Sequence, residues 1–261
     1  LRIRAQDRAV SAEGTSNRIE VQAGAPSAFS IHAPDEVQAG QPIDVRIEVQ
    51  DRFGNRVRRY NQIGSSVSVS VSGFPESSKQ ISPAQFRDAR ATVTLEQQEA
   101  GSVRVQANVD NGQQALTGQS QQIVVVPGPP GSLEIETPDR VMAGENFSAS
   151  LQLQDEFANP IRNTEGFAGQ IYVNVLDHGA QSEQKIRASQ LIKGQHGLSF
   201  SHDRAEEIRI FAEYRNNDIR TQSSTIEVVP GPFDHFAIRT PGEVRAGSEF
   251  TVGMQMRDEY G

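Results

Sequence analysis

One stretch of roughly 35 residues occurs three times in this chain. Its middle occurrence, from Val126 to Ile161, reads VPGPPGSLEIETPDRVMAGENFSASLQLQDEFANPI. Similar stretches stand before it, AGAPSAFSIHAPDEVQAGQPIDVRIEVQDRFGNRV, and after it, PGPFDHFAIRTPGEVRAGSEFTVGMQMRDEYG. Residues that recur about every 104 positions are Pro34, Pro138 and Pro241, Gly40, Gly144 and Gly247, and Asp51, Asp155 and Asp258. A fixed period of this length indicates tandem copies of one domain.

The period divides the chain into two complete copies and two partial ones. The complete copies are residues 24–127 and 128–230. Residues 1–23 match the last strands of a copy, and residues 231–261 match the first strands of another. About 100 residues are enough for a copy to build its own core. Because the chain opens inside one copy and stops inside another, we expect it to be a segment of a longer protein.

Alternating apolar residues predict that each copy consists of short strands. The residues from Ile43 to Val49 and from Phe147 to Leu153 alternate with period two, which is typical of a strand with one buried face. Further strands are predicted around residues 29–31, 67–71, 93–95, 103–109, 123–126, 171–175, 208–214 and 226–228. Short helical turns are expected only near residues 83–88 and 203–207. The predicted fold is all-β, with tandem immunoglobulin-like β-sandwich domains arranged end to end.

Turn-forming residues lie between these predicted strands. Asp110-Asn111-Gly112 predicts a hairpin. Asp51, Asp155 and Asp258 each precede a turn of Gly/Asn type, so we expect their carboxylates to bond to the turn backbone. A calcium ligand is the alternative for a recurring aspartate, but calcium needs several converging oxygens, and no DxD or DxN run is present here. A calcium site between domains stays open at Glu134, Glu136 and Asp139.

No other group of residues predicts a catalytic, metal or cofactor site. The five histidines show no HxH or HxxxH spacing, and we expect them to lie in surface loops; they are His32, His178, His196, His202 and His235. The chain has no nucleophile elbow and no phosphate-binding glycine loop, so we expect no enzymatic activity. It has no tryptophan for a carbohydrate-binding platform, and most of its phenylalanines are predicted to be core, including Phe29, Phe147, Phe236 and Phe250.

Composition excludes several classes of function. The net charge of −8 argues against nucleic acid binding, which needs a basic face. The absence of cysteine excludes disulfides and thiolate metal sites. No window has the roughly 18 apolar residues that a membrane helix requires. We therefore expect no membrane insertion within this segment.

The strand and turn motifs resemble a known family. The first copy contains VSVSVSG, then RATVTLEQQEAGSVRVQANVDNG, and it ends with IVVV. These motifs, repeated copy by copy, resemble the bacterial immunoglobulin-like repeats of the invasin and intimin adhesin group. The resemblance implies a rod of stacked domains on a bacterial cell surface or in a secreted protein, with functional parts elsewhere.

Proline-rich junctions favour a spacer function. Val126-Pro127-Gly128-Pro129-Pro130 and Val229-Pro230-Gly231-Pro232 join successive copies, and proline makes such segments short and semi-rigid. The main hypothesis is an adhesin-like stalk whose partners are the neighbouring repeats. A second is a binding module whose end loops, at residues 74–80 and 178–185, recognise a host or matrix protein. A third is an accessory region of a large extracellular enzyme.

Overall fold

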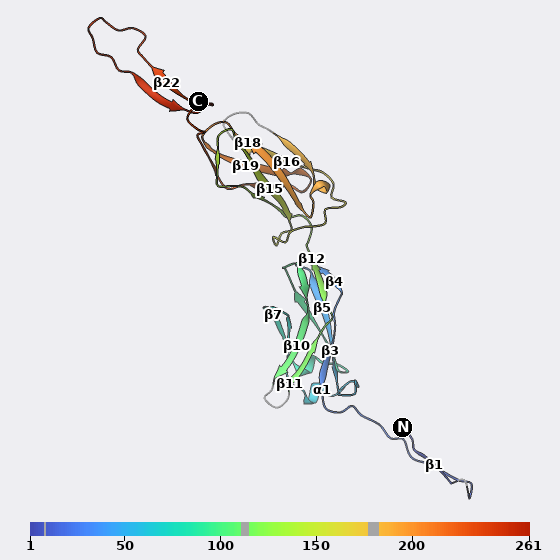
Figure 1. The fold of residues 1–261 in the computed structure, drawn as a ribbon. Helices are drawn as coiled ribbons and strands as arrows, with labels where there is room; N and C mark the ends of the chain where they lie inside the picture. The colour runs from blue at the N-terminus through green and yellow to red at the C-terminus, as the bar shows by residue number, and fades with distance from the viewer. Residues whose placement is uncertain (8, 111–114, 177–182) are drawn as a thin grey trace. The chain divides into compact units, whose positions relative to one another are not determined.

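The computed structural model describes residues 1–7, 9–110, 115–176 and 183–261 (Figure 1). The chain divides into two compact units, Leu1–Val126 and Pro127–Gly261. Nearly all regular structure in the described residues is β-strand, which confirms the predicted all-β class. No helix in the described ranges is long and apolar enough to cross a membrane.

The first unit contains a two-layer sandwich. Its smaller layer is an antiparallel sheet in the order β3-β5-β8, comprising β3 (Ala28–His32), β5 (Pro42–Gln50) and β8 (Arg90–Glu96). Ile31 pairs with Ile47, and Ile47 pairs with Ala91, so one face of all three strands is apolar and buried. Apolar and polar residues therefore alternate in the sequence because successive side chains of a strand point to opposite faces of the sheet, and only one face is buried.

The opposite layer consists of two short sheets. One has the order β11-β10-β6-β7, comprising β11 (Ala115–Gln119), β10 (Val105–Asp110), β6 (Val67–Val71) and β7 (Phe74–Ile81). The other has the order β4-β12-β9, comprising β4 (Glu36–Gln38), β12 (Ile123–Val126) and β9 (Gly101–Val103). Strands β4 and β12 are parallel, and all other pairs are antiparallel. This arrangement is an immunoglobulin-like sandwich.

The second unit repeats the plan. Its smaller sheet has the order β13-β15-β18, comprising β13 (Ser132–Glu136), β15 (Asn146–Gln154) and β18 (Gln195–Ser201). The other sheet has the order β14-β21-β19-β16-β17, and β20 also pairs with β19. Its strands are β14 (Arg140–Met142), β21 (Ile226–Val229), β19 (Glu207–Tyr214), β16 (Gln170–Leu176), β17 (Gln184–Arg187) and β20 (Ile219–Gln222). Again only the first pair, β14 with β21, is parallel.

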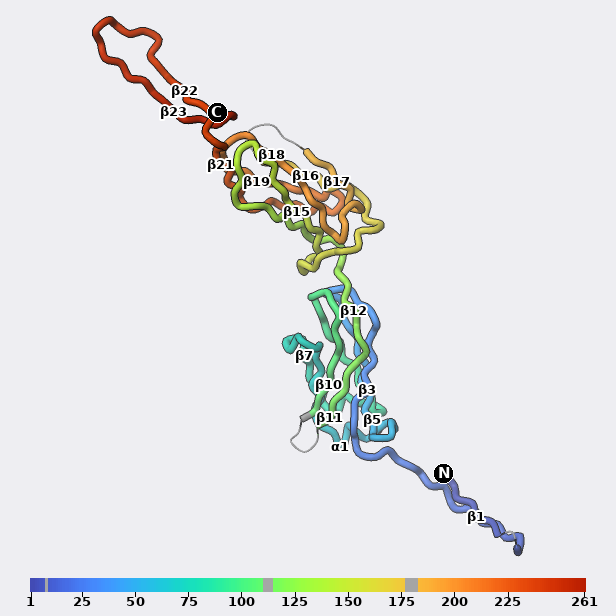
Figure 2. The backbone as a smooth tube through the Cα atoms, viewed as in Figure 1, coloured from blue at the N-terminus to red at the C-terminus, as the bar shows by residue number. Residues whose placement is uncertain are grey.

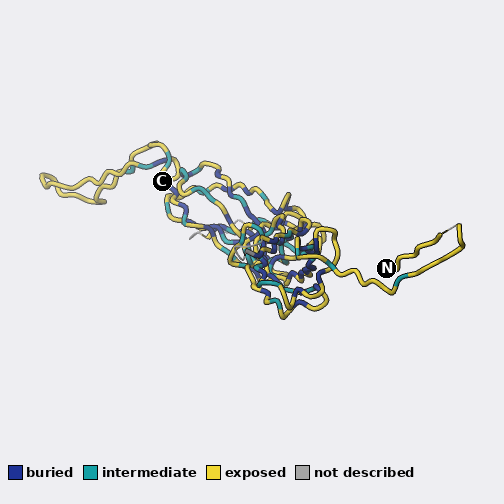
Figure 3. The backbone as a smooth tube through the Cα atoms, turned by 90° about the horizontal axis from the view of Figure 1, so that it is seen from below, coloured by how far each residue is buried: buried dark blue, intermediate teal, exposed yellow. Residues whose placement is uncertain are grey.

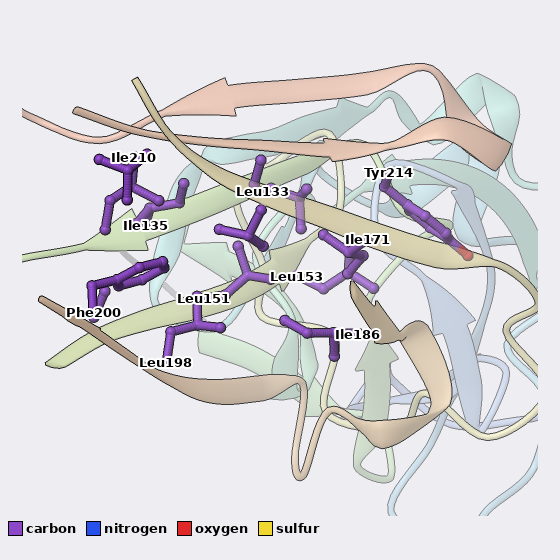
Figure 4. Packing of buried hydrophobic residues seen from close by; sticks show 14 of the residues in the cluster. Leu133, Ile135, Leu151, Leu153, Ile171, Ile186, Leu198, Phe200, Ile210 and Tyr214 are labelled. Carbon is purple, nitrogen blue, oxygen red and sulfur yellow. The ribbon is translucent and has the colours of Figure 1, made fainter. Parts of the chain in front are cut away.

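The core of the second sandwich lies between its two layers (Figure 4). Leu133 and Leu151 from one sheet face Ile171 and Ile210 from the other. The rings of Phe147 and Phe200, on neighbouring strands, lie 5.9 Å apart. Burying each such aliphatic side chain contributes about 1.5–3 kcal/mol. The burial of these alternating positions explains why the period-two pattern predicted the strands correctly.

Both ends of the chain form two-stranded hairpins. They are β1 (Arg4–Asp7) with β2 (Ala12–Thr15) and β22 (His235–Arg239) with β23 (Gly253–Arg257), and Figures 2 and 3 show them as narrow, mostly exposed ribbons. The expectation that Phe236 and Phe250 are core is wrong, since they are 50% and 55% exposed. A two-stranded ribbon has no second layer to cover its apolar face.

Strand β7 replaces a predicted loop. Its sequence FPESSKQI lacks apolar alternation because β7 is an edge strand, paired only to β6, and only Ile81 is buried. Such an edge also tolerates Pro75. In the second copy, β17 likewise begins within the predicted loop at residues 178–185, whose residues 178–182 lie outside the described part.

The short helices are only partly as predicted. The 3₁₀ turn η1 (Pro83–Gln85) confirms the first expectation, but residues 203–207 form no helical turn. Three others were missed: α1 (Tyr60–Ile63), η2 (Ala188–Gln190) and η3 (Arg215–Asn217). Each is a single turn, too short for a helical period. The predicted turn at Asn111-Gly112 lies outside the described residues, although Asp110 pairs with Ala115 across it.

A serine recurs near the end of each copy, and it is buried in the two complete copies. The hydroxyl of Ser120 accepts a bond from Val105 N–H at 2.9 Å and donates to the Gln121 carbonyl at 2.7 Å. Ser223 does the same with Ile210 and Ser224, at 2.9 and 2.7 Å. In the first partial copy, Ser16 accepts from Ile3 N–H at 2.9 Å. This hydroxyl satisfies the backbone where the chain crosses from one strand partner to the next.

We expect Ser223→Ala to destabilise the second sandwich by about 1–3 kcal/mol, because the buried Ile210 N–H loses its acceptor. Amide hydrogen exchange at Ile210, together with urea denaturation, measures the effect. Ser199→Ala, on the exposed face of β18, is the control and should change little. Equal exchange rates at Ile210 in both variants would contradict this role for the hydroxyl.

Candidate functional site: the aspartate clamp at the start of each copy

Asp51 joins two parts of the first copy that lie far apart in sequence. Its Oδ2 accepts a bond from the N–H of Gly24, 27 residues earlier, at 2.9 Å. Its Oδ1 accepts from Phe53 N–H and Asn55 N–H, both at 2.9 Å. The Asn55 amide adds a bond of 3.1 Å to Oδ2. We call this arrangement, an aspartate bonded both to its own turn and to the junction glycine, the aspartate clamp.

The second copy has the same clamp. Asp155 Oδ2 accepts from Gly128 N–H at 2.8 Å, and Oδ1 accepts from Phe157 N–H and Asn159 N–H at 2.9 Å. The Asn159 amide bonds Oδ2 at 2.9 Å. The residue is 0% exposed. A buried carboxylate is tolerated here because four donors replace its lost water.

The last partial copy has it as well. Asp258 accepts from Gly231 N–H at 2.8 Å and from the N–H groups of Tyr260 and Gly261 at 3.1 and 2.9 Å. The predicted role of these aspartates as turn caps is therefore confirmed. The bond to the junction glycine was missed, although Gly24, Gly128 and Gly231 recur at a constant distance before the aspartates. That constant spacing was the available signal.

The clamp also bears on the calcium alternative. A carboxylate has about four lone-pair sites, and Asp51 and Asp155 each use four in bonds to N–H donors. These two carboxylates therefore have no site left for a cation. The described residues contain no group of three or more His, Cys, Asp or Glu side chains placed to hold a metal ion.

The acidic residues proposed as an alternative calcium site have other contacts. Glu134 accepts a bond from the Gln154 amide, and Glu136 accepts one from the Ser150 hydroxyl at 3.1 Å. The backbone carbonyl of Asp139 accepts from Glu227 N–H at 2.9 Å. The structure thus places these residues in cross-strand contacts within one sheet or at the β14–β21 pair.

The four histidines within the described residues do not share a site, and the expectation that the histidines lie in loops is wrong for three of them. His32, His196 and His235 lie on strands β3, β18 and β22. His202 follows β18, and its Nε2 lies 2.9 Å from the Glu206 carboxylate. His178 lies outside the described residues. A single polar residue on the exposed face of a strand adds nothing to the apolar alternation, so the sequence does not distinguish it from a loop residue.

Hydrogen bonding stabilises the charged form of the clamp aspartates. The bond from Gly24 N–H is the main cause that lowers the pKa of Asp51 from its ordinary 3.8 to about 2, against the opposing effect of burial. Burial acts to raise the pKa of Asp155, but bonds from Asn159 and Gly128 outweigh it, and the pKa lies below its ordinary value. The bond from Gly231 likewise lowers the pKa of Asp258.

The clamp turn requires a left-handed backbone at its fourth residue. Gly54 has φ of +80° there, and Ala158 has φ of +64° at the equivalent position. Glycine adopts this conformation readily, whereas a residue with a β-carbon is strained by about 1–2 kcal/mol. Asn55 and Asn159 complete the turn by bonding the aspartate, so the second copy keeps the geometry despite its alanine.

Comparisons with known proteins give structural likenesses only. No protein-family model matches the chain, and no curated protein matches it. Among solved structures, the D0-D1 domain of intimin is similar at 14% identity and a TM-score of 0.29, covering 77% of this chain and 97% of that one. The Yersinia pseudotuberculosis adhesin InvE is similar at 14% identity and a TM-score of 0.32, with 82% and 65% covered. A putative membrane anchored protein from Corynebacterium diphtheriae has 14% identity and a TM-score of 0.33, with 87% and 62% covered.

We expect reciprocal changes in the clamp turn to have opposite effects. Ala158→Gly should stabilise the second sandwich by up to about 1 kcal/mol, because it relieves the left-handed strain at some cost in unfolded-state entropy. Gly54→Ala should destabilise the first sandwich by about 1–2 kcal/mol. Urea denaturation, followed by NMR signals of each unit, measures both.

Gly197→Ala is the matched control, because a β-carbon there meets nothing within 4 Å and the backbone is not left-handed. It should not destabilise the second sandwich. If Ala158→Gly lowered the stability of the second sandwich, the left-handed backbone of Ala158 would not be a source of strain.

We expect the first sandwich to lose stability as pH falls from about 4 to about 2. The folded pKa of Asp51 lies below its unfolded value, so the stabilisation is complete above pH 4 and disappears as the carboxylate is protonated. Asp51→Asn should lower stability at pH 7 and flatten this acid dependence. Asp44→Asn, on an exposed strand position, is the control. An unchanged acid profile in Asp51→Asn, from urea denaturation at each pH, would contradict the assignment.

Proposed function

We propose that this chain is a structural, non-enzymatic spacer of an adhesin-like bacterial surface or secreted protein, in which sandwich copies are stacked end to end. Its function is to provide length and stiffness. The surface location rests on the resemblance of its sequence motifs to adhesin repeats. The observation that carries the proposal is the aspartate clamp, which binds the junction backbone to the start of three successive copies.

Hydrogen bonds on either side of each junction support stiffness. The carbonyl of Val126, the last residue of its copy's final strand, accepts from Ala39 N–H at 2.8 Å. Two residues later, Gly128 N–H is bound by Asp155. Only Pro127 lies between these two tied residues, and its ring fixes φ. Such a junction has far fewer free torsions than a Gly/Ser tether.

The next junction uses the same device. Val229 C=O accepts from Ala143 N–H at 2.8 Å, and Gly231 N–H is bound by Asp258 at 2.8 Å. Pro230 is the one residue between them. Because the device recurs with the period of the sequence, it belongs to the repeat rather than to one junction. A repeated stiff junction suits a stalk better than a set of independently tumbling modules.

Small-angle X-ray scattering of the full chain tests this proposal. We expect an extended particle in which each complete copy adds roughly 30–40 Å, the length of its strands and turns. The double variant Pro127→Gly and Asp155→Asn should give a broader and more compact distribution, because it frees the junction. Pro75→Gly, away from any junction, is the control. A compact, folded-back particle from the unchanged chain would contradict the spacer function.

A further inference from the structure

The aromatic ring of Tyr260 lies directly over Gly144. A β-carbon built on Gly144 would lie only 2.1 Å from Tyr260 Oη and 2.4 Å from two ring carbons. The ring therefore occupies space that exists only because this residue has no side chain. Gly144 belongs to the second sandwich, whereas Tyr260 belongs to the partial copy that follows it. The contact thus joins two successive copies within the second unit.

The turn that receives the ring is held in place by its own sandwich. Ala143 N–H donates to Val229 C=O at 2.8 Å, and Gly144 N–H donates to His202 C=O at 2.9 Å. Gly144 has φ of +80°, a left-handed conformation that glycine adopts without strain. The turn is therefore fixed both to the final strand β21 and to the end of β18, beside the junction.

The first sandwich builds the same turn. Ala39 N–H donates to Val126 C=O and Gly40 N–H donates to Gln97 C=O, both at 2.8 Å, and Gly40 has φ of +76°. The Ala-Gly pair recurs a third time at Ala246-Gly247. A backbone surface without a side chain, held by two hydrogen bonds, is thus part of the repeated plan.

The ring is positioned by the aspartate clamp. Tyr260 follows Asp258 by two residues, and the aspartate accepts its N–H at 3.1 Å. The equivalent residues in the complete copies are also aromatic, Phe53 and Phe157. Phe53 is 72% exposed, with the Arg52 guanidinium 4.5 Å from its ring centre. Phe157 is partly buried. The exposed ring of Phe53 is therefore not required by the core of its own copy.

We infer that this aromatic residue is a docking surface for the Ala-Gly turn of a preceding copy. Tyr260 binds the turn of Ala143 and Gly144, and the exposed ring of Phe53 fits the Ala-Gly turn of a further copy of this domain. The partner is therefore another copy, recognised by a flat backbone patch that accepts a ring. The inference deepens the proposed spacer function, because the contact adds a second restraint beside the proline junction.

The absence of cysteine makes a direct test practical. Ser199→Cys in β18 and Thr240→Cys after β22, both at exposed positions, allow spin labels to report the distance between the second sandwich and the following hairpin. In the full chain carrying only these labels, we expect one narrow distance peak from electron–electron double resonance. Tyr260→Ser should abolish this narrow peak, whereas Tyr260→Phe, which keeps the ring, should retain it.

Two further variants make the result specific. Gly144→Ala should also abolish the narrow peak, because its β-carbon displaces the ring from the other side. Phe53→Ser makes the same kind of change at the equivalent position of the first copy and should leave the peak unchanged. A narrow peak that survives in Tyr260→Ser, or a broad distribution in the unsubstituted chain, would overturn the inference. An extended scattering particle together with an unchanged peak in Tyr260→Ser would leave the spacer function standing without this contact.

Discussion

The bond between a buried aspartate and a junction glycine connects the local structure of each copy with the organisation of the chain. A turn aspartate alone would order only the few residues that follow it. Here its second oxygen reaches a backbone N–H 27 residues earlier, so that one side chain fixes both a hairpin turn and the segment leading into the sandwich. Four donors per carboxylate offset the cost of burying the charge.

The same principle appears at the other end of each copy. The buried serines bond to the backbone where β11 or β20 gives way to the final strand, and the Ala-Gly turns bond to the last carbonyl before the junction. These residues are small, and the backbone bonds that they make or accept lie at the ends of the copy. Their contribution is to satisfy backbone groups at the places where the strand pairing changes. The strands can therefore differ in sequence between copies while the ends of the copies stay alike.

Much of the fold could be predicted from the sequence because a half-buried sheet produces a simple alternation. The strands from Ile43 to Val49 and from Phe147 to Leu153 were clear for this reason. Strand β7 was missed because an edge strand buries almost nothing, and the single helical turns were missed because they have no period. Phe236 and Phe250 were misjudged because alternation shows which face of a strand is apolar, but not whether another layer covers it.

The candidate site was predictable in part. The recurring aspartates indicated turn caps, and their own turn bonds confirm this. The partner Gly24 could not be read from propensity, because nothing in a glycine reveals what its N–H will bond to across 27 residues. Only the constant spacing between glycine and aspartate in three copies carried that information. Likewise, Phe53, two residues after Asp51, is of a residue type that is usually buried. Only the structure shows that it is exposed.

The parallel pairing of β4 with the final strand β12 has a consequence for how a copy is expected to respond to a pulling force. In the first sandwich, β4 runs alongside β12, tied by Val124 N–H to Asp35 C=O and by Ala39 N–H to Val126 C=O. Tension applied through the two ends of the copy draws these neighbours in opposite directions along their common axis. The force then acts along the strands, in shear, and loads all the hydrogen bonds at the same time instead of breaking them one after another. We therefore expect these bonds to resist the force until they break together.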